Sequence, residues 1–286
     1  AVCEAAFRVI KSAYENIDMR NHNGEHPRIG AVDVCPFIPL EGVTMSECAE
    51  MSVRLAKRVS SELELCTFLY GAAASSPERE LLSDLRKGQY EGFEERLKNK
   101  GPNLPDYGPT EWNEKTAKFG AVVIGARQIL VAYNVNVDEK DANAARKAGS
   151  LVRTTGRLLK KEDGRRTRIP GMLPMVQGMG LPLESHGISQ VSMNLRDVTI
   201  TPMHIAFEAV KSIVNDHGVN TCGSELVGLI PLSAMLDSGR WYADEGCTDE
   251  TELVNAAIRG LGLDHLAPFD AEDRIIEWAL AKEVEV

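Results

Sequence analysis

Segments with the spacing of helices alternate along the chain with short β-branched segments, and this alternation limits the fold more than any other feature of the sequence. Residues 44–47 (Thr-Met-Ser-Glu) form a capping-box pattern that predicts the start of a helix. Residues 66–70 and 129–137 are predicted strands. In a further predicted strand, 188–195, apolar and polar side chains alternate, so one face is expected to be buried. The alternation predicts an α/β protein.

The expected organisation is two subdomains. A chain of 286 residues suits two units of about 100–150 residues each. We predict an α/β (α+β-like) fold in which each subdomain has a mixed β-sheet with helices packed on its outer face. The N-terminal subdomain is expected to cover residues 1–124 and the C-terminal subdomain 125–286, with a short connection between them. Ligand sites favour such junctions.

The charge of the chain limits its partners. The formal net charge is −10, which disfavours nucleic acid or an anionic membrane as the main partner. No apolar run approaches the roughly 18 residues of a membrane span, and no leader pattern opens the chain, so a soluble, cytoplasmic protein is expected. Residues 146–168 are locally basic. They are interpreted either as a solvated helix end and loop or as a contact for an anionic substrate such as a folate polyglutamate tail.

Residues 20–30 contain two histidines, a carboxylate and two arginines, and we call this segment the histidine loop. From His22 to His26 it reads H-x-x-E-H, a zinc-binding pattern that requires a helix. Pro27 disfavours helical backbone at His26, and Gly24 costs about 1 kcal/mol in a helix interior, so no metal site is expected. Two interpretations remain: a polar surface loop, or a site where histidine transfers protons and arginine binds carboxylate.

The histidine loop and the residues after it resemble the formiminotransferase family. Residues 26–39, HPRIGAVDVCPFIP, are similar to that family's hallmark almost position by position. Further matching blocks keep their order over nearly the whole chain, at 17–20, 42–45, 69–71, 106–109, 125–127, 132–136, 227–232, 266–270 and 274–277. Many ordered blocks are specific, whereas a single short motif would not be.

The resemblance implies a transferase domain of two α/β subdomains around a folate-binding tunnel, usually a homodimer. Such a domain moves a formimidoyl group from N-formimidoyl-L-glutamate to the co-substrate tetrahydrofolate, giving 5-formimidoyltetrahydrofolate and glutamate, in histidine degradation and one-carbon metabolism. Family members begin with a strand bearing a Pro-Asn-Phe-Ser-Glu-Gly motif and a segment that contributes a carboxylate. Neither is present in this sequence, so we expect the N-terminal subdomain to lack its first strands. The cyclodeaminase activity of the bifunctional animal enzymes is not expected.

The catalytic residues follow from the resemblance and from the chemistry of the loop. The histidine of the His-Pro-Arg triplet, here His26, is the implied base. Its neighbour Glu25, or else Asp33, is expected to face the cationic amidinium of the substrate, although Asp33 could instead cap a turn. Arg28 and Arg127 are expected to bind carboxylates of substrate or folate, unless each forms a structural ion pair.

The resemblance also places folate against the loop from Gly108 to Gly120. Gly108, Pro109 and Thr110 are expected to line the pterin, because a glycine lets backbone approach a flat ligand closely. The alternative is a plain Gly-Pro turn. Gly120 and Asn134 match family positions and are also expected to bind substrate or folate.

Two other functions remain open. The first is a glutamate formyltransferase acting on 5-formyltetrahydrofolate, in which the transferred group carries =O in place of =NH. The second is a non-catalytic folate-binding protein. The sequence does not separate either one from formimidoyl transfer.

Overall fold

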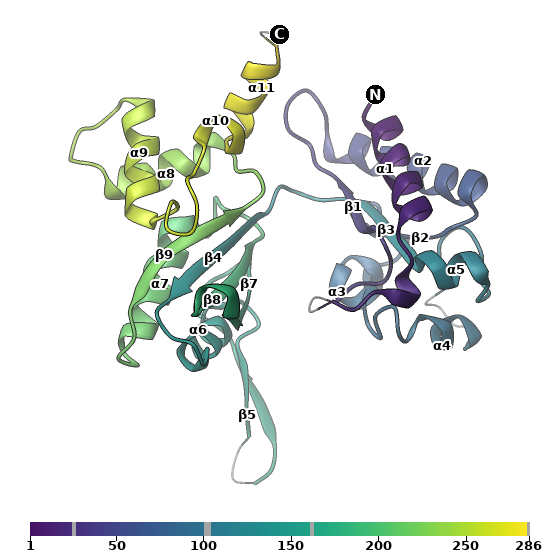
Figure 1. Ribbon diagram of the computed structural model, residues 1–286, viewed down its shortest axis with the longest axis horizontal. Helices are drawn as coiled ribbons and strands as arrows, with labels where there is room; N and C mark the ends of the chain where they lie inside the picture. The colour runs from purple at the N-terminus through teal and green to yellow at the C-terminus, as the bar shows by residue number, and fades with distance from the viewer. Residues whose placement is uncertain (25–26, 100–103, 161–162, 285–286) are drawn as a thin grey trace. The chain divides into compact units, whose positions relative to one another are not determined.

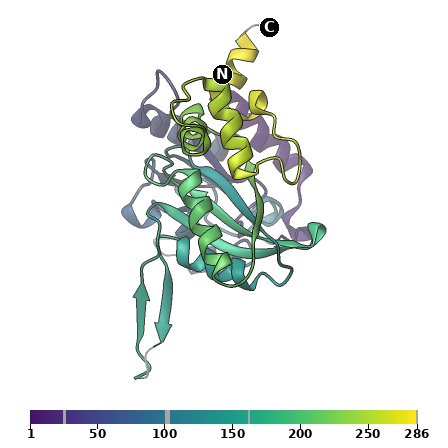
Figure 2. The same cartoon turned by 90° about the vertical axis from the view of Figure 1, so that its left-hand side faces the viewer.

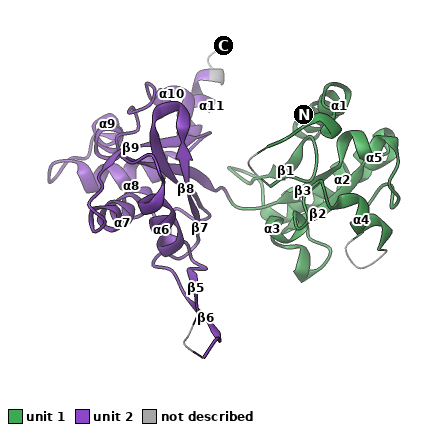
Figure 3. Ribbon diagram, turned by 60° about the horizontal axis from the view of Figure 1, so that its bottom comes forward, with its two compact units in different colours: residues 1–128 green, residues 129–286 purple. Residues whose placement is uncertain are grey.

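A computed structural model describes residues 1–24, 27–99, 104–160 and 163–284. The chain forms two compact units, Ala1–Gln128 and Ile129–Val286, coloured green and purple in Figure 3. Each unit contains a sheet and helices, so the expected α/β fold with two subdomains is confirmed. The division follows Gln128 and not residue 124, because strand β3 (Ala121–Ala126) continues unbroken past that point.

The first unit is built on a three-stranded sheet with the order β1-β3-β2. β1 (Asp33–Phe37) and β2 (Cys66–Gly71) both pair with β3 in the parallel sense. Every residue of β3 is buried, as is usual for the central strand of a parallel sheet that is covered on both faces. β1 lies at an edge, which suits its Pro36, because proline cannot donate a hydrogen bond to a neighbouring strand.

Helices cover both faces of this first sheet (Figure 1). The helices of the unit are α1 (Val2–Asn16), α2 (Met45–Leu63), α3 (Leu82–Leu85), α4 (Phe93–Lys98) and α5 (Glu114–Phe119). Phe7 of α1 and Leu55 of α2 share a core cluster with Val122 of β3. Phe93 of α4 belongs to a second cluster with the next β3 residue, Val123. Helices on the outer face alone are therefore the wrong expectation here, since β3 is apolar on both sides.

The second unit is built on a four-stranded antiparallel sheet with the order β7-β8-β4-β9. Its strands are β4 (Val131–Val137), β7 (Val176–Leu183), β8 (Ile188–Leu195) and β9 (Thr221–Val227). The alternation predicted for β8 is confirmed, because Val191, Met193 and Leu195 are buried. The strand pairs of the first sheet are all parallel and those of the second sheet are all antiparallel, whereas a mixed sheet was expected in each subdomain.

Helices of the second unit bury one face of its sheet. They are α6 (Asn143–Val152), α7 (Met203–Asn215), α8 (Leu232–Tyr242), α9 (Glu250–Leu261), α10 (Ala271–Arg274) and α11 (Ile276–Val284). Tyr133 and Val135 of β4 share a core with Ala148 of α6 and Val210 of α7. No helix within the described part of the chain is both long and apolar enough to cross a membrane.

A two-stranded hairpin of β5 (Arg157–Lys160) and β6 (Arg166–Ile169) extends from the second unit (Figures 1 and 2). Its side chains are exposed apart from the half-buried Arg157. A helix end and loop is therefore the wrong expectation for the basic residues beyond α6. The chain leaves the core here, and its backbone groups are satisfied by pairing across the hairpin.

The capping box predicted at the start of α2 is confirmed, since Thr44 Oγ1 accepts from Glu47 N at 3.2 Å and Glu47 Oε2 accepts from Thr44 N at 2.8 Å. Thr44→Ala is expected to lower the free energy of unfolding by about 1 kcal/mol, because the first turn loses a hydrogen-bond acceptor. Urea unfolding followed by circular dichroism measures the change. Thr44→Ser keeps the hydroxyl and is the control; equal losses in both variants would contradict this role.

Candidate active site

The histidine loop is attached to the amino-terminal end of the first sheet. Glu25 and His26 lie outside the described residues, and the residues on either side of them are described. The carbonyl of Ile29 accepts from Ala121 N, the first residue of β3, at 3.1 Å. This bond fixes the backbone that follows His26 against the central strand.

Two glycines make this attachment close. Gly30 and Gly120 form an antiparallel bridge. A Cβ on Gly30 would lie 2.1 Å from Ala121 O, and a Cβ on Gly120 would lie 2.2 Å from Ile29 O. Gly120 also has a φ of +78°, in the left-handed region that favours glycine. The absence of a side chain at Gly120 therefore permits the contact with the histidine loop, and the expected contact of Gly120 with substrate or folate stays a prediction.

Arg28 is engaged by protein groups. Its Nη1 and Nη2 donate to Glu91 at 2.9 and 2.6 Å, its Nε donates to His22 Nδ1 at 3.3 Å, and its Nη2 donates to His22 O at 3.2 Å. A fifth bond, at 3.4 Å, reaches Gln89 Oε1, and a guanidinium has five N–H donors. The carboxylate of Glu91 raises the pKa of Arg28. This arrangement favours the structural ion pair over the predicted contact with a substrate carboxylate.

Asp33 caps a turn, which is the alternative that the sequence left open. Its Oδ1 accepts from Ile29 N at 2.9 Å and from Arg86 Nε at 3.2 Å, and its Oδ2 forms an ion pair with Arg86. The backbone of Asp33 has a φ of 61°, a conformation that aspartate adopts more readily than most residues. The carboxylate thus holds the end of the histidine loop to the start of β1.

The loop expected to contact folate is fixed to the start of β2. Gly108 has a φ of +95°, and a Cβ there would lie 2.2 Å from Leu65 O. The carbonyl of Pro109 accepts from Cys66 Sγ at 3.1 Å, whereas Thr110 is exposed. The absence of a side chain at Gly108 therefore permits close contact with the chain's own backbone, and the expected contact with the pterin stays a prediction.

Arg127 has fewer partners than Arg28. Its Nη1 donates to Gln128 O at 2.9 Å, and it makes no ion pair with a described residue. Nearby, the buried Tyr70 hydroxyl has no hydrogen-bond partner among the described residues. Burial raises the pKa of Tyr70, and the charge of Arg127 opposes that rise. The contact of this guanidinium with a carboxylate of substrate or folate stays a prediction, and no ion pair with a described residue competes with it.

The expected site residues of the first unit fall at two ends of its sheet. Asp33, Gly108 and Gly120 lie at the amino ends of β1, β2 and β3, together with the described flanks of the histidine loop. Arg127 follows the carboxyl end of β3. A strand of six residues spans roughly 20 Å. The structure therefore brings the first group together and places Arg127 a strand length away.

In the second unit, Asn134 belongs to a polar face of the sheet. It lies on β4 opposite Glu225 of β9. Its Nδ2 donates to Glu225 Oε2 at 3.2 Å, and Gln190 Nε2 donates to the same oxygen at 3.1 Å. Glu225 Oε1 has no hydrogen-bond partner among the described residues. The half-buried carboxylate is thus held by two amides and keeps one oxygen for a ligand.

The amide network continues behind Glu225. Asn136, with 0% exposure, accepts from Gln190 Nε2 at 2.8 Å and contacts His265 Nδ1 at 3.2 Å. Buried amides with satisfied partners hold one arrangement, because an unpaired buried polar group is costly. We call Asn134, Asn136, Gln190 and Glu225 the amide–carboxylate face. Glu225 was not predicted from the sequence as a site residue. The alternating polar residues of strand 188–195 did predict that this sheet has a polar face.

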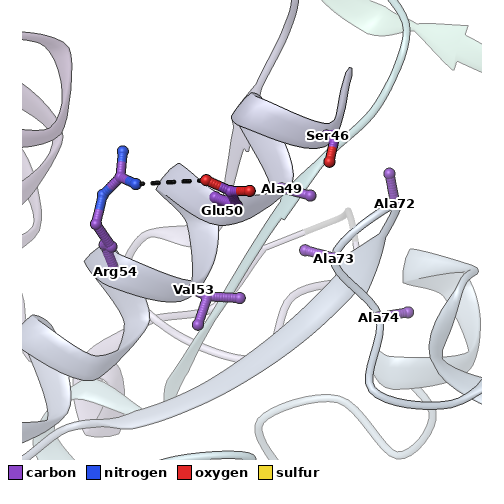
Figure 4. A pocket seen from close by; sticks show the side chains of 8 residues that line it. All are labelled: Ser46, Ala49, Glu50, Val53, Arg54, Ala72, Ala73 and Ala74. Carbon is purple, nitrogen blue, oxygen red and sulfur yellow. Dashed lines mark ion pairs between the residues drawn. The ribbon is translucent and has the colours of Figure 1, made fainter. Parts of the chain in front are cut away.

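A pocket of about 460 Å³ lies between α2 and the loop after β2 in the first unit (Figure 4). It is lined by Ser46, Ala49, Glu50, Val53, Arg54, Ala72, Ala73 and Ala74. Glu50 and Arg54 are paired at 3.9 Å and well exposed, so their attraction is weak. None of the expected site residues lines this pocket. Within the described ranges, no group of three or more His, Cys, Asp or Glu side chains is arranged to hold a metal ion.

Comparison with known sequences extends these observations. The family model described as "Formiminotransferase domain, N-terminal subdomain" matches residues 1–127, and "Formiminotransferase domain" matches residues 132–281. A glutamate formimidoyltransferase of Streptococcus pyogenes serotype M1 is 39% identical over 242 residues, which are 85% of this chain and 75% of the relative. One from Thermoplasma acidophilum is 37% identical over 261 residues, covering 89% of this chain and 80% of the relative.

A formimidoyltransferase-cyclodeaminase of Rattus norvegicus is 40% identical over 280 residues, which are 97% of this chain and 49% of the relative. The chain thus spans about half the length of such relatives. The structure is that of an α/β protein with two units. One unit carries the histidine loop and the other carries the amide–carboxylate face. The chain belongs to the formiminotransferase domain family, as its sequence blocks predicted.

Gly120→Ala is expected to destabilise the protein markedly more than Gly42→Ala. Both glycines have positive φ, +78° and +68°, but only the Cβ at position 120 meets backbone, whereas nothing lies within 4 Å at position 42. Both variants therefore carry the same backbone strain of roughly 1–2 kcal/mol, and only Gly120→Ala adds a steric clash with backbone atoms. Urea unfolding of both variants measures the difference. Equal destabilisation would show that the contact with the histidine loop is not tight.

Proposed function

We propose that this chain transfers a formimidoyl group from N-formimidoyl-L-glutamate to tetrahydrofolate, giving 5-formimidoyltetrahydrofolate and glutamate. The observation that carries the proposal is the match to both subdomains of the family, joined to 39% identity with a relative named glutamate formimidoyltransferase. The two compact units correspond in this proposal to the two subdomains. Family resemblance alone supports the further proposal of a cytoplasmic homodimer.

His26 acts as the base in this proposal. Nitrogen 5 of tetrahydrofolate attacks the amidine carbon, and His26 accepts the proton that this nitrogen loses. The bond between that carbon and the glutamate nitrogen then breaks, and the imidazolium returns a proton to the departing amine. Glu25 faces the cationic amidinium. Support for the role of His26 comes from the matching His-Pro-Arg triplet and from the suitability of imidazole for proton transfer near neutral pH, whereas the role of Glu25 is proposed from its negative charge and its position next to His26.

In this proposal, substrate and folate bind to side chains whose donors or acceptors are not all paired with described residues. The pteridine presents adjacent N3–H and 2-amino donors, and Glu225, with one unpaired oxygen in the amide–carboxylate face, fits such donors. Arg127, without an ion pair to any described residue, suits a carboxylate of folate or glutamate. Pro109 and the exposed Thr110 remain proposed folate contacts on the strength of the resemblance.

His26→Ala is expected to lower kcat by roughly 100- to 10,000-fold, because general base catalysis is lost. The Kd of tetrahydrofolate should change little, since the imidazole acts on a proton and not on binding. A spectrophotometric assay with tetrahydrofolate and N-formimidoyl-L-glutamate gives kcat, and calorimetry gives Kd. His186→Ala, at an exposed histidine, is the matched control. Full turnover by His26→Ala would end this assignment.

The same assay separates the alternatives. Formimidoyl transfer that greatly exceeds transfer from N-formylglutamate supports the proposal. Faster formyl transfer would instead identify a formyltransferase, and folate binding without either activity would identify a binding protein.

Glu225→Gln is expected to raise the Kd of tetrahydrofolate roughly tenfold or more, because an amide replaces a charged acceptor. Glu245→Gln makes the same change at an exposed position outside the amide–carboxylate face and should leave the Kd unaltered. Calorimetric titration of both variants provides the comparison. Equal affinity in Glu225→Gln and the unchanged protein would exclude the pteridine contact.

A further inference from the structure

The described part of the histidine loop contains a second imidazole with a defined partner. His22 follows a short 3₁₀ turn, Met19–Asn21, and its side chain is exposed. Its Nδ1 accepts a hydrogen bond from Arg28 Nε at 3.3 Å, and its carbonyl accepts from Arg28 Nη2 at 3.2 Å. Arg28 therefore ties together the two ends of the segment that contains His26.

Glu91 holds Arg28 in this position. The carboxylate accepts from Nη1 at 2.9 Å and from Nη2 at 2.6 Å, a two-point contact that fixes the plane of the guanidinium. The preceding residue, in the turn between α3 and α4, adds a backbone bond, because Tyr90 N donates to Arg28 O at 2.9 Å. Arg28 is only 9% exposed, so its geometry is set by the protein.

The contact with Arg28 determines which ring nitrogen of His22 carries the proton. A guanidinium N–H is only a donor, so Nδ1 must present its lone pair. The neutral ring then carries its proton on Nε2. Gly24 leaves room for the ring, since a Cβ there would lie 3.1 Å from His22 Cε1. His22, an exposed residue, thus offers an N–H donor at Nε2.

We propose that Glu91 and Arg28 are positioning residues that hold His22 as an Nε2–H donor, and that this donor binds a carboxylate oxygen of the glutamate substrate. The five donors of Arg28 are occupied within the protein, so His22 takes the contact that the sequence assigns to Arg28. The identity of the carboxylate ligand rests on the proposed function. The relay from Glu91 to His22 does not.

Long-range proton–nitrogen NMR on protein labelled at histidine nitrogen tests the relay without any activity. The His22 signals are assigned by their loss in His22→Gln. We expect the Nε2–H form in the unchanged protein, and Glu91→Gln should convert it to a mixture of ring forms. Glu94→Gln removes an equivalent charge from the surface pair with Lys98 on α4 and should leave the spectrum unaltered. An Nδ1–H form in the unchanged protein, or no response to Glu91→Gln, would overturn the relay.

Steady-state kinetics test the substrate contact separately. His22→Ala should raise the KM for N-formimidoyl-L-glutamate roughly tenfold, the effect of one lost hydrogen bond to a charged group, with a much smaller change in kcat. Glu91→Gln should raise the same KM, and Glu94→Gln should not. If Glu91→Gln unfolds, Arg28→Lys replaces it, because lysine keeps the charge and loses the two-point contact. An unchanged KM in His22→Ala would overturn the carboxylate contact even if the NMR result supports the relay.

Discussion

The backbone contact between Gly30 and Gly120 determines where the histidine loop can lie. A side chain at either position would place its Cβ 2.1 or 2.2 Å from a backbone oxygen across the contact, so the loop could not approach β3 this closely. Because the backbone at Gly30 contacts the backbone at Gly120, the chain that follows His26 is fixed against the start of the central strand β3. That strand is buried along its whole length, so the attachment point lies on the core of the unit.

Two ion pairs to the region of α3 and α4 also hold the loop and the residue that opens β1. Arg86 holds Asp33, which follows the loop at the start of β1, and Glu91 holds Arg28 near the end of the loop. Both partners come from the region of α3 and α4, which the hydrophobic contact of Phe93 with the sheet keeps in place. The apolar packing of one face of the sheet thus supports the polar geometry of the proposed catalytic loop. Each unit uses one well-packed layer to position a set of polar groups.

Local signals in the sequence were sufficient for several elements. The Thr44–Glu47 box predicted the start of α2, and the alternating side chains of β8 predicted its buried face. Each of these depends on residues a few positions apart. The ordered family blocks added the fold and the position of the proposed base.

The partners of site residues could not be predicted in the same way. Arg28 and Glu91 are 63 positions apart, and no local pattern indicates that they meet. Gly108 and Gly120 were recognised as special, but the atoms they approach, Leu65 O and Ile29 O, come from other elements. The β5–β6 hairpin is rich in basic residues, as a surface loop can also be. Its composition therefore did not predict the antiparallel pairing that the structure shows.

A crystal structure of the protein with bound tetrahydrofolate would test the central claim most directly. We predict that the His26 imidazole lies within about 3 Å of nitrogen 5, directly or through one water, while Arg28 remains paired with Glu91. An imidazole that points away from the bound pterin, with another basic side chain beside nitrogen 5, would contradict the account.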